Sequence, residues 1–141
     1  MDFLTSLEAS ASGLYAQRKR MNIIASNLAN LETTRTDKGG PYRRKMVVMR
    51  SKSMTGSFKN ILDGQVEGVQ IEQIVEDKSP FNKVFNPSHP DADKDGYLLK
   101  PNVELIVETT NMLMARRAFE ANIVAIKAAR QMILKALEIG R

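Results

Sequence analysis

Two seven-residue hydrophobic repeats, one near each end of the chain, constrain its fold more than any other feature. Residues 102–139 contain no Gly and no Pro, and large apolar side chains recur there at Leu105, Met112, Phe119, Ile126 and Ile133. Near the other end the same spacing holds for Leu7, Leu14, Met21 and Leu28. A repeat of seven keeps one side of an α-helix facing one partner helix. We therefore predict two long terminal helices that meet other helices, the second of them roughly 55 Å long.

The residues between the two helices predict short strands. Val and Met are frequent in residues 42–50, and residues 69–76 alternate apolar with polar side chains, with Val69, Ile71 and Val75 on one side. Such alternation is typical of a half-buried strand. We expect residues 51–65 to form a flexible excursion and residues 97–100 a short extended piece.

The expected fold is mainly α with a small β-rich insertion. The long N- and C-terminal helices are predicted to pair as a coiled-coil-like hairpin, with the central strands and loops outside it. This divides the chain into an N-terminal helix of the core at residues 1–34, a central strand and loop region at 35–101, and a C-terminal helix of the core at 102–141.

Short local signals predict the helix ends. The first helix is predicted to start between residues 2 and 6. Thr5 followed by Glu8 fits a capping box, whereas an earlier start would bring Phe3 and Leu4 into the helix, and both stay open. Asn102 is a candidate N-cap of the second helix, and Gly140 is a candidate stop signal.

The first helix also contains Gly13, which lowers helix stability by about 1 kcal/mol relative to Ala. That helix is therefore expected to be marginal without its neighbours.

Three asparagines interrupt the otherwise small and apolar helix surfaces, and a buried amide can fix helix register at some cost in stability. We expect these amides to bond backbone groups or each other across helices. Either the two helices form an ordinary hairpin within one chain, or they pair and also use their remaining faces on adjacent subunits, which we favour. The predicted subunit interface consists of Leu7, Leu14, Met21, Asn27, Leu28, Asn30, Met112, Phe119, Asn122, Ile126 and Ile133.

Positive charge is concentrated in one part of the chain. Residues 18–52 hold ten Lys or Arg against Glu32 and Asp37, a net charge of +8 in a chain whose total is +5. Such a cluster can attract nucleic acid or an anionic surface. No aromatic stacking pattern accompanies the charge, which favours a solvated face or a match to an acidic neighbour. A basic coiled-coil nucleic-acid-binding protein is the alternative interpretation, and a helical signalling adaptor is a third.

The sequence offers little for catalysis or metal binding. It has no Cys, which excludes thiol chemistry, and a lone His89 cannot supply a site of several imidazoles. Residues 91–96 match the opening of a calcium loop, D-x-D-x-D-G, but Asn102 stands where that loop needs a bidentate Glu. A carboxylate-rich turn is the preferred interpretation. No nucleophile elbow or phosphate-binding loop is present, so we predict no enzyme, no cofactor and no metal site.

Membrane insertion and a cleaved leader are also not expected. No stretch approaches 18 uncharged apolar residues, and residues 1–4 lack the basic start of a secretory signal peptide.

Several segments resemble one family. Residues 22–30, NIIASNLAN, resemble the N-terminal signature of the axial proteins of the bacterial flagellum. Residues 33–44, residues 86–96 with their H-P-D-A-D core, and residues 117–122 together with 136–141 narrow the likeness to proteins of the proximal rod of the basal body. The likeness covers the chain nearly end to end.

Two places depart from the family's pattern. The family often has Asn-Thr-Thr where this chain reads Glu32-Thr33-Thr34. The second is residues 51–65, which match no motif.

The resemblance implies a structural subunit of the flagellar basal body. Such a subunit is expected to leave the cytoplasm through the flagellar type III export apparatus without a cleaved signal. It would then polymerise with other rod proteins and with further copies of itself into a motility drive shaft that crosses the periplasm. Marginal helices suit this route, because they can fold on docking, where packing offsets the ordering entropy. Nucleic acid, small-molecule substrates and membrane embedding are not expected.

Overall fold

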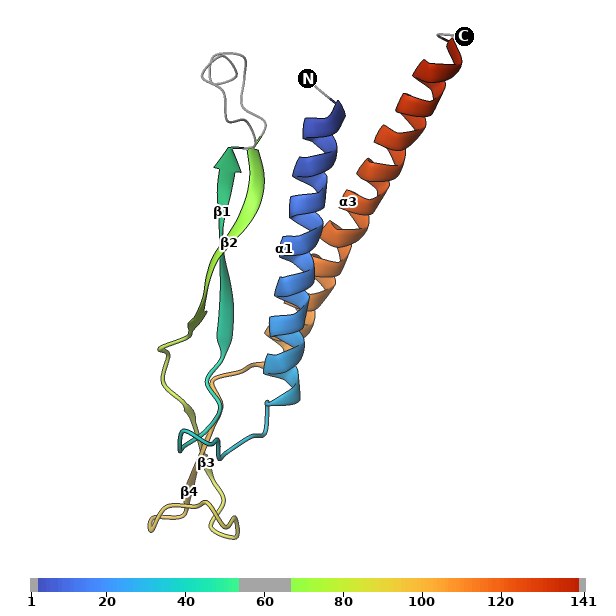
Figure 1. Cartoon of the computed structure of the whole chain (residues 1–141). Coiled ribbons are helices and arrows are strands. Elements are labelled where there is room, and N and C mark those ends of the chain that lie inside the picture. Colours follow the sequence, from blue (N-terminus) through green and yellow to red (C-terminus); the bar gives the residue numbers. More distant parts are fainter. Residues whose placement is uncertain (1–2, 54–66, 140–141) are drawn as a thin grey trace.

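The computed structural model describes residues 3–53 and 67–139. Its elements are α1 (Phe3–Ala29), β1 (Lys45–Ser53), β2 (Glu67–Glu76), β3 (Asn82–Phe85), β4 (Tyr97–Lys100) and α3 (Leu105–Ile139). The two helices run antiparallel and pack against each other, and the β1–β2 ribbon lies along α1 on the side away from α3 (Figure 1). The expected mainly α fold with a small β-rich insertion agrees with this architecture.

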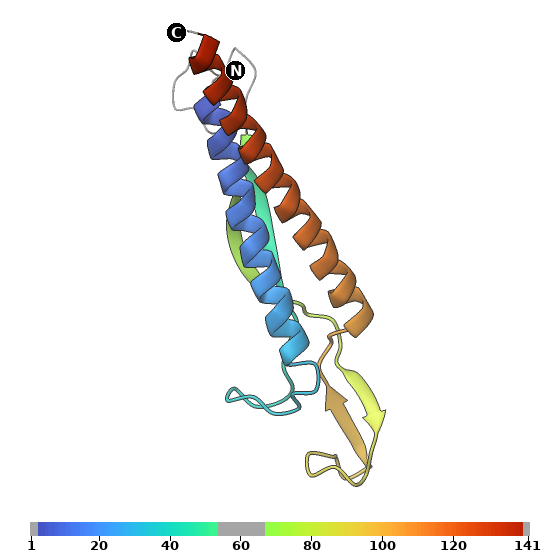
Figure 2. The same ribbon diagram turned by 90° about the vertical axis from the view of Figure 1, so that its right-hand side faces the viewer.

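The two helices differ in length. Helix α1 has 27 residues and α3 has 35, and both views show the C-terminal turns of α3 projecting beyond the start of α1 (Figure 2). Among the described residues, no helix is both long enough and apolar enough to cross a membrane.

The helix ends differ in part from their sequence signals. Helix α1 begins within the predicted interval, but at Phe3, so Thr5 lies inside the first turns and the capping box is wrong. Asn102 is not the N-cap of α3, because the helix begins at Leu105 and the carbonyl of Glu104 accepts the first helical hydrogen bond from Glu108. The Asn102 side chain is used elsewhere, as described below. The stop signal predicted at Gly140 lies outside the described residues.

Strands β1 and β2 form an antiparallel ribbon from the pair Lys45–Glu76 to the pair Ser53–Glu67. Strand β1 therefore continues to Ser53, so the excursion predicted from residue 51 is wrong for residues 51–53, and residues 54–65 lie outside the described part. Val48 pairs with Gln73 and Met49 with Ile71, which leaves Glu72 as an extra residue in a β-bulge.

The expected burial pattern of β2 holds only in part. Ile71 and Val75 are half-buried as predicted, whereas Val69 is 37% exposed.

The second hairpin lies at the end of the molecule opposite the termini (Figure 1). Strands β3 and β4 pair from Asn82–Lys100 to Phe85–Tyr97, and the two aromatic rings meet edge to face at 5.4 Å. Gly96 closes the connecting loop with a positive φ of 78°, and a Cβ there would lie 2.9 Å from the Phe85 ring. A side chain at this position would therefore clash with the hairpin.

The apolar core of a single chain is small. Among the described residues, the buried hydrophobic side chains are Ala16, Ile24, Tyr42, Leu98, Val103, Ala115 and Ala129. Many larger apolar side chains are exposed instead, most of them on α3. Apolar burial is the main stabilising contribution to folding, so an isolated chain is expected to have a small free energy of unfolding.

Candidate functional site

Helix α3 presents one continuous edge to the rest of the chain. The residues of this covered edge follow each other in alternating steps of four and three and are buried or half-buried: Glu108, Met112, Ala115, Phe119, Asn122, Ile126, Ala129 and Ile133. The repeat predicted from the sequence is therefore largely the covered edge. Leu105 is an exception, because its side chain is 55% exposed.

The residues predicted for the subunit interface are covered to different degrees within one chain. Asn27 is completely buried, and the other ten are half-buried. Leu14 of α1 and Phe119 of α3 line one shallow hollow, so these two positions meet inside the chain. Their contribution to contacts between subunits stays a prediction.

The two helices approach closely at Gly13. A Cβ placed on Gly13 would lie 2.9 Å from the Nδ2 atom of Asn122 and 3.3 Å from its Cγ and Oδ1 atoms. A real Cβ essentially never comes within 2.9 Å of another heavy atom, so the Asn122 amide would have to shift. The glycine in α1 thus leaves room for an amide on the covered edge of α3.

A second apolar stripe on α3, its open face, consists largely of exposed residues. It comprises Val107, Met114, Ala118, Ala121, Ala125, Ala128, Met132 and Ile139, again in steps of three, four or seven. Met114 is 58% exposed and Ile139 is 86% exposed. Sequence reasoning missed this stripe, although its spacing of seven from Val107 to Ala128 could have revealed it.

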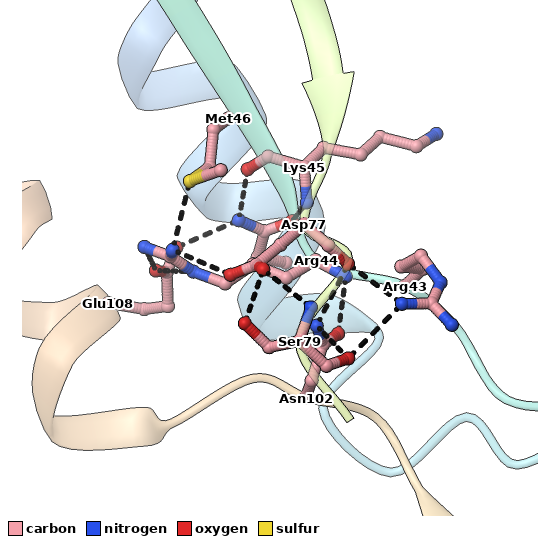
Figure 3. Close-up of polar contacts among 9 residues, drawn as sticks. Arg43, Arg44, Lys45, Met46, Asp77, Ser79, Asn102 and Glu108 are labelled. Atoms are coloured by element: carbon pink, nitrogen blue, oxygen red, sulfur yellow. Dashed lines mark hydrogen bonds and ion pairs between the residues drawn. The ribbon is translucent and has the colours of Figure 1, made fainter. Parts of the chain in front are cut away.

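A polar junction joins the helices to the strands (Figure 3). At its centre lies Asn27 of α1, which is fully buried. Its Nδ2 atom donates to the Lys45 carbonyl at 2.9 Å, and its Oδ1 atom accepts from the Lys45 N–H at 3.0 Å. The Tyr42 hydroxyl also donates to this Oδ1 atom, at 3.0 Å. The amide therefore satisfies both backbone groups of the first residue of β1.

Glu108, on the first turn of α3, is the buried charge of the junction. It accepts hydrogen bonds from Asn27 Nδ2 at 2.9 Å and from Arg44 Nε and Nη2 at 2.8 and 2.7 Å (Figure 3). Its side chain is 1% exposed, while that of Arg44 is 20% exposed. A buried carboxylate is tolerated only when it is paired and hydrogen-bonded, as it is here.

The junction extends to the end of β2 through Asn102. The Arg44 N–H donates to Asn102 Oδ1 at 2.9 Å, and Asn102 Nδ2 donates to the Asp77 carbonyl at 3.1 Å (Figure 3). Hydrogen bonds from the Ser79 hydroxyl and backbone N–H lower the pKa of Asp77 below its ordinary value, and the nearby Arg44 guanidinium adds to this effect. The four residues named here hold β1, β2 and the segment before α3 together.

Only part of the junction was visible in the sequence. Asn27 was predicted as a structural amide, and its bonds to the Lys45 backbone agree with that expectation. The buried, paired role of Glu108 was missed, although an acidic residue in steps of seven from Ala115, Asn122 and Ala129 is a readable signal. Asn30, also predicted, donates to Ser26 of its own helix at 2.8 Å.

The Asp-rich loop is held by its own backbone and by Thr34 and Arg35, whose guanidinium lies 3.9 Å from the Asp91 carboxylate. Backbone hydrogen bonds run from Asp93 to Tyr97 and from Gly96 to Asp93, and His89 Nδ1 accepts from the Asp91 N–H at 3.1 Å. Asp91 accepts from the Thr34 hydroxyl at 2.9 Å. No three metal-ligating side chains gather in the part of the chain that the structure describes.

Two family models match the chain at its two ends. One, described as "Flagella basal body rod protein", matches residues 7–35, which include most of α1. The other, described as "Flagellar basal body rod FlgEFG protein C-terminal", matches residues 94–139, which include β4 and α3.

Curated relatives match nearly the whole chain, and those cited here are all named flagellar basal-body rod protein FlgC. The protein of Bacillus subtilis (strain 168) is 45% identical over 96% of this chain and 97% of its own length. That of Borreliella burgdorferi is 38% identical over 99% of this chain and 98% of the relative. That of Salmonella typhimurium is 35% identical over the full length of both.

Proposed function

Because the chain belongs to the FlgC family of flagellar basal-body rod proteins, it is a structural and non-enzymatic rod subunit, and we propose that it polymerises through its terminal helices into the proximal part of the drive shaft. The relatives also confirm the resemblance to flagellar rod proteins inferred from the sequence. The flagellar basal body is accordingly its location, and other rod components and further copies are its partners.

The observation that carries the proposal is the open face of α3. A helix that is apolar on more than one side is expected to be buried on more than one side. One side of α3 is covered by its own chain, whereas Met114, Met132 and Ile139 are 58%, 54% and 86% exposed. A continuous exposed apolar face on a single chain is typical of an assembly surface.

The residues predicted for the subunit interface fit this proposal as a supporting layer. We propose that α1 and the covered edge of α3 pair as a coiled-coil-like hairpin, which is supported by the alternating steps of four and three along that edge. The hairpins, formed by residues 1–34 and 102–141, would then make the inner layer of the rod, and residues 35–101 would lie outside it.

The same proposal accounts for the export route of the subunit and for the positive charge of residues 18–52. A subunit whose helices gain most of their burial on docking suits passage through the type III export apparatus without a cleaved signal, into a rod that crosses the periplasm. Several residues of the basic segment already have partners within the chain. Arg44 pairs with Glu108, the Arg43 guanidinium lies 4.3 Å from the Phe81 ring centre, and Arg35 and Arg50 form ion pairs with Asp91 and Glu72. This use of the charge supports a protein partner and gives the nucleic-acid alternative no specific observation in its favour.

The proposal is tested by placing a charge on the open face. Met114→Lys should leave the purified chain folded, because the side chain is already exposed, and should abolish motility when it replaces the native chain in a flagellated cell. Gln73→Lys, on an exposed position of β2, is the matched control and should leave motility intact. Circular dichroism of both variants checks folding. Normal swimming of the Met114→Lys strain would show that the open face is not an assembly surface.

A further inference from the structure

A groove of about 300 Å³ opens where α1, β1 and the first turns of α3 converge. Its apolar lining comes from Ile23, Ile24, Met46, Val47 and Met49. This volume is at the lower end of the range for small-molecule pockets, so the groove is suited to a few side chains of a partner.

The groove also holds a positive charge that no carboxylate of the described residues pairs with. Arg44 at its edge is paired with Glu108, and the Lys45 ammonium lies 5.6 Å from the centre of the Tyr42 ring. Arg20 is different: no carboxylate of the described residues forms an ion pair with it. The occupant of the groove should therefore be apolar and carry one negative charge.

The last turns of α3 have this chemistry. Leu134 and Leu137 are 50% and 66% exposed, and Glu138 is exposed beside them, because positions three and four residues apart share one side of a helix. Among the described residues, the last turn has no basic side chain. A carboxylate at the negative end of a helix dipole is locally unfavourable. Lys135 lies one turn before Glu138, and a further cation from outside would add to its stabilisation.

We propose that this groove receives the last turns of α3 from a second copy of the chain, with Leu134 and Leu137 against its apolar wall and Glu138 paired with Arg20. The inference deepens the proposed rod function and rests on it. A chain cannot fill its own groove, because Asn111 lines the groove and Leu137 follows 26 residues later in the same helix, about 39 Å away. The contact joins two different surfaces, so its repetition gives a ring if the rotation between copies closes and a helical assembly if it does not.

Disulfide cross-linking tests the contact directly, because the sequence has no Cys of its own. A disulfide forms only when two Cα atoms come within about 7 Å, so a double variant Met46→Cys/Leu137→Cys should yield a ladder of dimers and larger species under mild oxidation. Met46→Cys/Val124→Cys is the matched control, with its second Cys at a 64% exposed position in the middle of α3, and should remain monomeric. An absent ladder, or a dimer of Leu137→Cys alone in equal yield, would overturn the proposal.

A charge exchange provides a second measurement. Glu138→Arg, added to the Met46→Cys/Leu137→Cys variant, should slow ladder formation several-fold, and a further Arg20→Glu change should restore it, since it recreates an opposite-charge pair. Equal rates in all three variants would contradict the pairing of Glu138 with Arg20.

The same double variant, oxidised in basal bodies within motile cells, separates this inference from the proposed function. Swimming cells without cross-links would overturn the groove contact alone. Motility in cells that lack the chain would overturn its role in the rod.

Discussion

At the level of single residues, Asn27 acts towards Lys45 as a neighbouring strand would. Its amide donates to the carbonyl and accepts from the N–H of the same residue, at 2.9 and 3.0 Å. Buried backbone groups need such partners, and within residues 3–53 and 67–139 β1 pairs with no strand other than β2. A helix side chain therefore completes the hydrogen bonding of the ribbon edge.

Replacing Asn27 by Ala should lower the free energy of unfolding substantially. The change leaves both Lys45 backbone groups, the Tyr42 hydroxyl and one oxygen of Glu108 without this partner. A buried group left unsatisfied costs about 1–3 kcal/mol, so we expect a total loss of at least about 2 kcal/mol. Chemical denaturation of the purified chain measures the difference.

Asn30→Ala is the control for that measurement. The Asn30 amide donates only to the Ser26 carbonyl of its own helix and accepts from Thr33, and the residue is half-buried. Water can replace these bonds, so the loss should stay below about 1 kcal/mol. Similar losses in the two variants would contradict the special role given to Asn27.

At the level of elements, the packing of α1 on α3 depends on a residue that weakens α1 by itself. Gly13 disfavours the helix, yet a Cβ at this position would lie 2.9 Å from the Asn122 amide. The sequence identified both residues as unusual for their helices but could not show that they oppose each other. The close approach fixes how the two helices align along their length.

Gly13→Ala should therefore destabilise the chain, against the helix propensity of Ala. Propensity alone favours Ala by about 1 kcal/mol, while overpacking costs about 1–3 kcal/mol, which gives a net loss of up to about 2 kcal/mol. In an Asn122→Ala background the same change should stabilise by about 1 kcal/mol, because the obstacle is gone. A double-mutant cycle followed by thermal melting measures both values. Equal values in both backgrounds would show that Gly13 and Asn122 do not interact.

The elements that a sequence predicts well here are those with a long internal period. The repeats from Leu7 and from Leu105 identified both helices, because a seven-residue period is a local property. The helix start at Leu105 was misjudged, because Asn102 has the right residue type for an N-cap but bonds to Arg44 instead.

The ion pair between Glu108 and Arg44 was not predictable from the sequence, because it is a long-range contact. Arg44 lies 64 residues away in the chain, and only the fold brings the two together. Helix α3 carries two overlapping apolar repeats, one along the covered edge and one along the open face. The sequence interpretation followed the stronger repeat, so the open face was missed.

At the scale of the whole molecule, burial decreases along the long axis. The polar junction, with Glu108 and Asn27 fully buried, lies where α3 begins and α1 ends. Every residue from Leu134 to Ile139 is exposed, and the figures show this end of α3 extending past α1. Local stability should follow the same gradient, because opening is easiest where few apolar contacts hold an element.

Hydrogen exchange of the purified monomer should reveal this gradient within one helix. Amides near Ala115 should exchange at least about tenfold more slowly than those of residues 134–139, because the former open only when the packed helices separate. Linking copies through the groove should then protect residues 134–139, while residues near Ala115 change little. Exchange measured by mass spectrometry on the monomer and on the cross-linked ladder compares the two states. Uniform exchange along α3 in the monomer would mean that its projecting end is already stabilised without a partner, and the reason for docking it into a neighbour would be lost.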